Sequence, residues 1–231
     1  MKVVILAAGK GTRMESLTEK VPKVLVEVNG KPFLYYVLKN LQKAGYKDFC
    51  LVVGYKKEKV TEYLDQSNFK VTIVEQKEQL GTGHAVLQAK EFVGEEDFLV
   101  VSGDNLFSKD DLKKMNKEDD YYYIAGLEVE EWQKYGILIT ENNFLKEIKE
   151  KPKDFVGPLI NLGLYKCKPE IFPLLEQLKS SPRGEIELTD ALNTLANEKK
   201  VKIVEGEWWV DLGCKEDIAR VEHFLDDNWE E

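Results

Sequence analysis

A glycine-rich turn near the amino terminus carries groups that suit phosphate binding. Residues 9–14 read GKGTRM and follow a short apolar run at residues 3–8. A dinucleotide-binding loop needs a third glycine where Met14 stands, and a Walker A loop needs a Gly-Lys-Ser/Thr ending that is missing here. What remains is a turn with exposed backbone N–H groups, the Thr12 hydroxyl and the Arg13 guanidinium. These groups predict contacts to phosphate oxygens, with a solvated surface turn as the other interpretation.

An aspartate and a lysine could hold further parts of a phosphate ligand. Asp104 follows an apolar run at residues 97–102, and open α/β sheets place their ligands at the carboxyl ends of strands. Carboxylate oxygens are the ligands that Mg²⁺ prefers, so Asp104 is a candidate metal ligand, with a turn aspartate as the alternative. Pro22 fixes the backbone just before Lys23, a second cation at short range from the glycine turn.

Segments along nearly the whole chain resemble the sugar-1-phosphate nucleotidyltransferase family, which makes UDP-, dTDP-, CDP-, ADP- and GDP-sugars. In order they are LAAGKGTRM (6–14), VPKVL (21–25), NGKPFL (29–34), QLGTGHA (79–85), SGDN (102–105), EKP (150–152), NLGLY (161–165), GEIELTDAL (184–192) and WWVDLG (208–213). Each match alone is unspecific, and their order makes the resemblance specific. It is nearest to glucose-1-phosphate thymidylyltransferases and to the N-terminal domains of N-acetylglucosamine-1-phosphate uridylyltransferases. One departure is Ser16, where many members have proline.

The resemblance implies roles for individual residues. It implies that the nucleotide is contacted by Leu6, Ala7, Ala8, Gly9, Gly11, Thr12, Gln76, Gly81, Thr82 and Gly103. Among these residues, Gln76 would pair with the base. It implies that Arg13 and Lys23 are catalytic, and that Asp104 and Asp211 hold Mg²⁺. It implies contacts to the sugar phosphate from Gly136, Glu150, Lys151 and Asn161. His84 is expected to pack or cap locally, because this reaction needs no imidazole.

The elements that must position these residues alternate between strand and helix. Apolar runs and helical spacing predict, in the first half, strands at 3–8, 48–55, 70–75 and 97–102, with helices at 33–44, 57–64 and 82–92. In the second half they predict strands at 121–128, 136–140, 144–150, 159–165, 201–206 and 208–213, with helices at 169–179, 186–199 and 215–227. The predicted fold is an α/β three-layer sandwich with a mixed, mainly parallel sheet, as in the family's Rossmann-like nucleotidyltransferase domain. We expect one domain over residues 1–231 and no C-terminal β-helix domain.

Composition narrows the classes of partner. The net charge of −9 argues against nucleic-acid binding. The sequence contains no run of 18 apolar residues, so it predicts no membrane span. Three scattered cysteines show neither a disulfide framework nor metal-ligand spacing, which suits the cytoplasm.

The predicted reaction joins an NTP (UTP or dTTP) to a sugar 1-phosphate (of glucose or N-acetylglucosamine) with Mg²⁺, giving an NDP-sugar and pyrophosphate. The alternatives are a CTP-dependent transferase acting on a small phosphorylated alcohol and a non-catalytic regulatory relative. A glycosyltransferase would need a D-x-D metal motif, which residues 103–105 do not supply. The oligomeric state stays open.

Overall fold

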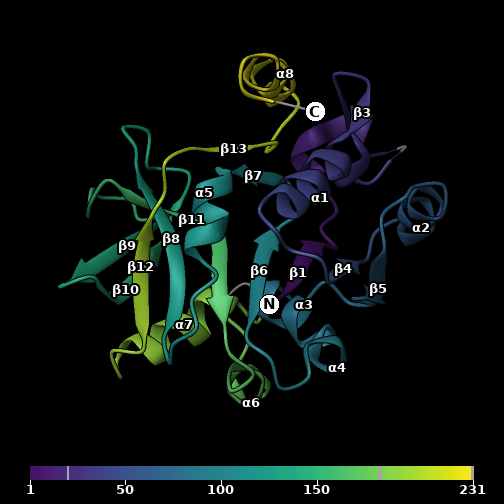
Figure 1. The fold of residues 1–231 in the computed structure, drawn as a ribbon. Helices are drawn as coiled ribbons and strands as arrows, with labels where there is room; N and C mark the ends of the chain where they lie inside the picture. Colours follow the sequence, from purple (N-terminus) through teal and green to yellow (C-terminus); the bar gives the residue numbers. More distant parts are fainter. Residues whose placement is uncertain (20, 182–183, 230–231) are drawn as a thin grey trace.

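A nine-stranded mixed sheet forms the centre of the computed structural model, which describes residues 1–19, 21–181 and 184–229, with the backbone alone at 15 and 16. Its strands are β1 (Lys2–Ala7), β4 (Phe49–Val53), β5 (Val71–Glu75), β6 (Phe98–Ser102), β8 (Tyr122–Glu128), β9 (Gly136–Glu141), β10 (Phe144–Glu150), β11 (Leu159–Cys167) and β12 (Val201–Glu205). They lie in the order β5-β4-β1-β6-β11-β8-β12-β10-β9. Two short two-stranded sheets join β2 (Glu27–Val28) to β3 (Lys31–Pro32) and β7 (Asn105–Phe107) to β13 (Trp209–Asp211) (Figure 1).

Helices cover both faces of the sheet. They are α1 (Phe33–Lys43), α2 (Lys57–Asp65), α3 (Thr82–Gln88), α4 (Lys90–Val93), α5 (Lys109–Lys114), α6 (Ile171–Gln177), α7 (Leu188–Ala196) and α8 (Asp217–Asn228), with short 3₁₀ turns η1 (Thr12–Leu17) and η2 (Lys23–Leu25). Among the described helices, none is long and apolar enough to cross a bilayer. In Figure 1, α8 lies at the top of the molecule, and α4 and α6 lie at the bottom.

Two separate apolar cores show that the sandwich has three layers. Val3 and Ile5 of β1 belong to the core that includes α1, α2, α5 and α8. Val4, between them, belongs to the opposite core with α3, α6 and α7. Because successive side chains of a strand point to opposite faces, β1 contributes to both cores. The predicted α/β sandwich with a mixed sheet is therefore confirmed.

Parallel pairing places several loops at one edge of the sheet. β1 pairs in parallel with β4 and β6, and β4 pairs in parallel with β5. The loops that follow these strands contain the glycine turn, Gln76, and Gly103 with Asp104. Since parallel strands end at the same edge, their loops lie close together there, as the sequence predicted for a ligand site.

The second half of the sheet reverses direction at β11. This strand runs antiparallel to both β6 and β8, with Leu164 opposite Val101 and Asn161 opposite Gly126. The start of β11 therefore lies at the edge where β6 ends. β9 and β10 pair antiparallel, whereas β12 runs parallel to β8. Parallel pairing is thus concentrated in the first half of the chain and antiparallel pairing in the second.

A fully buried lysine lies near the opposite edge of the sheet. Lys166 Nζ is 3.0 Å from Asp97 Oδ2 and 3.3 Å from Asp119 Oδ1, and it also donates to the backbone oxygens of Asp119 and Tyr121. Burial raises the pKa of Asp119, but hydrogen bonds from Tyr123, the Tyr121 N–H and Lys166 hold that pKa below its ordinary value. The charge on Lys166 is thus compensated inside the fold.

Four predicted helices differ from the structure by two residues or more, and those predicted at 169–179 and 215–227 begin only at Ile171 and Asp217. The helix predicted at 82–92 breaks at Ala89 into α3 and α4. The helix predicted at 186–199 begins only at Leu188, because the preceding segment is used in a main-chain contact. Ile186 N–H donates to Leu80 O over 2.7 Å, and Gly83 N–H donates to Ile186 O over 2.8 Å. β7 and α5 are elements that the sequence patterns did not predict.

Candidate functional site

The glycine turn is shaped by close contacts that only glycine permits. Gly11 has φ +64°, and a Cβ there would lie 3.0 Å from both Lys23 Cβ and Thr18 Cγ2. The Thr18 hydroxyl and the Met14 N–H both donate to Gly11 O, at 3.0 Å and 2.8 Å. The Gly11 backbone therefore lies against the Lys23 side chain, which brings the two cationic segments of the predicted site together.

An open cavity of about 430 Å³ lies over this turn. Its walls include every predicted nucleotide contact but one: Leu6, Ala7, Ala8, Gly9, Gly11, Thr12, Gln76, Gly81 and Thr82. Arg13, Lys23 and Asp104 line the same cavity. The exception is Gly103, which is not among the lining residues and whose N–H donates to Leu6 O at 2.8 Å. The structure thus brings the predicted phosphate and base residues, together with Asp104, to one cavity, whereas Asp211 is not among its lining residues.

Lys23 and Asp104 form an ion pair inside this cavity. Lys23 Nζ lies 2.5 Å from Asp104 Oδ2, and the side chains are 12% and 30% exposed. A charge-assisted hydrogen bond of this kind is short and fixes both groups in place. The two were predicted as separate functional residues, and the structure places them in direct contact.

Asp211 reaches the same region through the short sheet of β7 and β13. Asp211 lies opposite Asn105, and the Leu212 N–H donates to Asp104 O at 2.8 Å, so the main chains at the two predicted metal ligands are joined. Gly213 lines the cavity next to them. A Cβ on Gly213 would lie 3.0 Å from Asp211 Oδ2, so a larger residue would crowd that oxygen.

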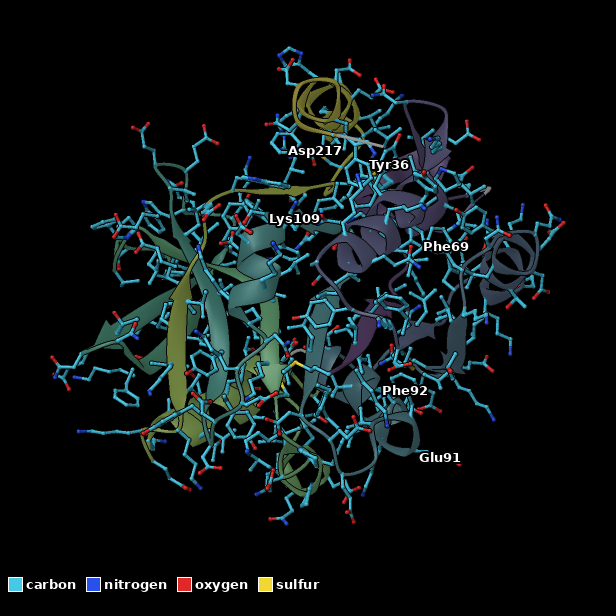
Figure 2. All side chains as sticks on the ribbon, viewed as in Figure 1. Tyr36, Phe69, Glu91, Phe92, Lys109 and Asp217 are labelled. Atoms are coloured by element: carbon cyan, nitrogen blue, oxygen red, sulfur yellow. The ribbon has the colours of Figure 1, made fainter. Side chains whose placement is uncertain are left out.

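Arg220 on α8 holds Asp211 from the other side. Its Nη2 donates to Asp211 Oδ1 at 2.8 Å and to Asp217 Oδ1 at 3.0 Å. Burial lowers the pKa of Arg220, but hydrogen bonds to the two carboxylates outweigh it and raise the pKa. Burial raises the pKa of Asp217, and the hydrogen bonds from Arg220 and the Cys214 N–H bring it below its ordinary value. Figure 2 shows Asp217, the first residue of α8, at the end of the molecule opposite Phe92.

The base-side wall is built around Gln76. This side chain is 4% exposed, and its Nε2 donates to Gly81 O at 3.0 Å. Gly81 has φ +99°, and a Cβ there would lie 2.6 Å from Ile186 O, so no larger side chain fits. The Thr82 hydroxyl donates to Glu187 Oε2 at 2.9 Å and accepts from the Leu188 N–H, which ties the loop to the start of α7.

Five cavity residues with polar side chains suited to ligand contact were not singled out from the sequence: Lys10, Gln79, Ser102, Glu185 and Glu187. Lys10 lies inside the glycine turn, and Gln79 lies inside QLGTGHA, where its Nε2 donates to Ala8 O at 2.8 Å. Glu185 and Glu187 belong to the GEIELTDAL segment. That segment matched the family pattern, but it was predicted to be the start of a helix, so its position in the cavity wall was not predicted.

The four predicted sugar-phosphate residues lie beyond the lining of this cavity. Gly136 pairs with Glu150 across β9 and β10, and a Cβ at Gly136 would lie 2.9 Å from Glu150 Oε2. Asn161 donates to the Tyr165 hydroxyl and accepts from the Gly163 N–H. The Lys151 side chain is 55% exposed, and its Nζ lies 3.9 Å from Glu150 Oε1. They gather at the adjoining edge of the sheet, where β11 begins and β10 ends.

A backbone bulge joins this group to the cavity. The β11 pairing shifts between Asn161 and Tyr165, and Asn105 Nδ2 donates to Leu162 O at 2.9 Å. Gly163 has φ +75°, and a Cβ there would lie 2.9 Å from Ser102 Oγ, a group in the cavity wall. The predicted sugar residues are therefore neighbours of the cavity through β11.

Comparison with known proteins matches this geometry to a family. The family described as Nucleotidyl transferase matches residues 2–228. The "Bifunctional protein GlmU" of Methanocaldococcus jannaschii is 40% identical over 228 residues, which cover 97% of this chain and 54% of that protein. This chain therefore spans about half the length of that relative. The "UTP--glucose-1-phosphate uridylyltransferase AglF" of Haloferax volcanii is 34% identical, over 97% of this chain and 96% of that protein.

Solved structures agree with the fold. A crystal structure of a Bacillus anthracis protein assigned as a glucose-1-phosphate thymidylyltransferase superimposes with a TM-score of 0.88 at 26% identity, covering 100% of this chain and 98% of that one. The predicted Rossmann-like nucleotidyltransferase fold and the predicted family are confirmed. The chain belongs to the nucleotidyl transferase family.

Proposed function

We propose that the chain is a sugar-1-phosphate nucleotidylyltransferase, which joins an NTP to a sugar 1-phosphate and releases pyrophosphate. The observation that carries this proposal is the single cavity whose wall joins the glycine turn, Arg13, Lys23 and Asp104 to the loop around Gln76. A nucleoside triphosphate needs both a cationic, N–H-rich surface and a neutral surface for its base. UTP or dTTP, with glucose or N-acetylglucosamine 1-phosphate, are the favoured substrates. The names of two similar proteins, a UTP–glucose-1-phosphate uridylyltransferase and a glucose-1-phosphate thymidylyltransferase, support glucose 1-phosphate with UTP or dTTP.

The reaction is an in-line displacement at the α-phosphorus. An oxygen of the sugar phosphate, which is already anionic, forms the new P–O bond. The bond from the α-phosphorus to the bridging oxygen breaks, and its electron pair leaves on pyrophosphate. No general base is required, so catalysis rests on positioning and on neutralising charge. Arg13 and Lys23 would hold the triphosphate and stabilise the leaving pyrophosphate.

Asp104 and Asp211 suit a magnesium ion in their chemistry and their placement. Both supply carboxylate oxygens, and the Leu212 N–H to Asp104 O contact joins their main chains. Gly213 leaves Asp211 Oδ2 uncrowded, since a Cβ there would lie 3.0 Å from that oxygen. Mg²⁺ often takes only one or two protein carboxylates and completes its shell with substrate phosphates and water. When bound, it would neutralise charge on the α-phosphate.

The acceptor is proposed to bind where β9, β10 and β11 meet. Glu150 and Asn161 would hydrogen-bond sugar hydroxyls, and Gly136 would leave room for the ring. Lys151 would meet the sugar phosphate as an exposed point charge. This placement puts the acceptor next to the cavity, because Gly163 of β11 lies close to Ser102 Oγ in the cavity wall.

Pyrophosphate release in the presence of Mg²⁺ tests the proposal. UTP, dTTP, CTP, ATP and GTP are each combined with glucose 1-phosphate, N-acetylglucosamine 1-phosphate, mannose 1-phosphate and phosphocholine. We expect release with UTP or dTTP and at least one sugar phosphate. Release only with CTP and phosphocholine would instead support a transferase for phosphorylated alcohols. Silence of the folded protein across the whole grid would contradict an enzyme of this class.

A further inference from the structure

A histidine that the proposed mechanism does not use lies against the base-side wall. His84 Nδ1 is 3.0 Å from Gln76 Nε2, and Gln76 lines the cavity whereas His84 is not among its lining residues. Gln76 is 4% exposed, so its amide has little room to rotate without changing partners. His84 is therefore connected to the cavity through the amide of Gln76.

The partners of the Gln76 amide fix which end faces the cavity. Nε2 lies 3.0 Å from Gly81 O, and a carbonyl oxygen can only accept a hydrogen bond, so the group facing it must be the NH₂. The second proton of that NH₂ is directed to His84 Nδ1. Within the part of the chain that the structure describes, no donor is recorded at Gln76 Oε1. The carbonyl oxygen is thus the polar atom that Gln76 offers to a ligand.

The same contacts determine the tautomer of the His84 ring. To accept from Gln76, Nδ1 must carry no proton, so the ring is neutral and its proton lies on Nε2. On the far side Gln88 Nε2 donates to His84 O at 3.0 Å and lies 3.4 Å from the ring Nε2. The opposite tautomer would set two donors against each other at the shorter, 3.0 Å contact, so the Nε2–H form has the lower energy.

From this geometry we propose that His84 is a positioning residue for base selection: it holds Gln76 so that an oxygen acceptor, not an NH₂ donor, meets the pyrimidine. Uracil and thymine present an N–H at position 3, which pairs with that oxygen. Cytosine presents a bare nitrogen there, which needs a donor. The inference rests on the proposed nucleotidyl transfer and specifies its nucleotide as UTP or dTTP over CTP.

Three variants separate this role from a packing role. His84→Phe keeps a ring but removes the acceptor, His84→Asn restores an acceptor oxygen near the position of Nδ1, and His223→Phe changes the other histidine, which is 82% exposed on α8. The readout is the ratio of kcat/KM for UTP to that for CTP. We expect His84→Phe to lower this ratio about tenfold, through KM more than kcat, because one oriented hydrogen bond is lost. We expect His84→Asn to recover most of it, and His223→Phe to match the wild type.

The tautomer can be measured on the native His84 ring, so this test does not depend on the folding of a His84 variant. Long-range ¹H–¹⁵N spectra distinguish histidine tautomers, and His223→Phe assigns the His84 signals because the chain has only two histidines. We expect the proton on Nε2. The opposite tautomer, or an unchanged UTP-to-CTP ratio in His84→Phe, would overturn the inference while leaving the transferase activity intact. If calorimetry shows that the wild-type protein binds neither UTP nor CTP, that result would contradict both the proposed function and this inference.

Discussion

Gly81 offers the most direct test of how the base-side wall is built, because a single methyl group there would meet the main chain of a distant segment. A Cβ on Gly81 would lie 2.6 Å from Ile186 O and 2.9 Å from Ile186 N. Gly45 is a matched control. Its φ is +100° against +99° for Gly81, and a Cβ there would meet nothing within 4 Å. Gly81→Ala and Gly45→Ala therefore both place a side chain at a strongly positive φ, and only Gly81→Ala adds the clash.

The expected magnitudes follow from that difference. An alanine at such a φ costs about 1–3 kcal/mol in both variants. Pushing a methyl group into a packed backbone costs about 1–3 kcal/mol more, in Gly81→Ala alone. The segment that must move carries Gly81 and Thr82, both in the cavity wall, and the Gly81 carbonyl that holds Gln76. Losing about 1.4 kcal/mol of contacts there lowers UTP affinity about tenfold.

Thermal unfolding and calorimetric titration with UTP measure both effects. In a chain of this length each kcal/mol lowers Tm by about 2–4 °C, so Gly81→Ala should melt measurably below Gly45→Ala. Gly45→Ala should bind UTP as the wild type does. Equal melting temperatures for the two variants, with unchanged UTP affinity in Gly81→Ala, would refute the account of the Ile186 contact.

Three further outcomes are expected. Arg13→Ala and Asp104→Asn should each lower kcat by more than about tenfold in pyrophosphate release while circular dichroism stays native, since each removes charge stabilisation at the phosphates; normal turnover would contradict these roles. Lys166→Met removes the cation shared by Asp97 and Asp119 and should lower the free energy of unfolding in urea by about 1–3 kcal/mol, since both carboxylates are partly exposed and keep other partners. A cost near zero would mean that the pairing is not needed. Because the pKa of Asp119 is lowered by folding, its ionised form stabilises the protein above about pH 4, and that contribution is lost as pH falls further. Asp119→Asn should therefore melt below the wild type at neutral pH and approach it on acidification; parallel Tm curves would argue against this linkage.

The strands of the first half could be predicted because their signals are local. The apolar run at 3–8 corresponds to β1 at Lys2–Ala7, and the run at 97–102 corresponds to β6 at Phe98–Ser102. A buried parallel strand needs only a short apolar run and a glycine-rich stop, and both are visible without tertiary contacts. The placement of the glycine turn and Asp104 at one edge then follows from parallel pairing.

Other parts of the site depend on contacts between residues far apart in sequence. The chemistry of Glu185 and Glu187 favours the start of a helix, and nothing local shows that Ile186 pairs with Leu80. The three-residue strand β7 is too short for a periodic pattern, and nothing local shows that it pairs with the strand predicted at 208–213, yet this pairing joins the backbones at Asp104 and Asp211. The roles of the predicted site residues, the single domain and the lack of a β-helix domain stay predictions.

The contact between Ile186 and the loop at residues 80–83 uses main-chain atoms only, which sets how this region can change during evolution. Any residue but proline at position 186 supplies the N–H that Leu80 O accepts and the carbonyl that the Gly83 N–H requires. The number of residues between Ile186 and the first turn of α7 is, in contrast, fixed by the reach of the chain, since Leu188 N–H meets Thr82 only two residues later. The hydrogen bonds should therefore survive a substitution of Ile186 by any residue except proline, whereas a one-residue insertion or deletion before α7 should break them.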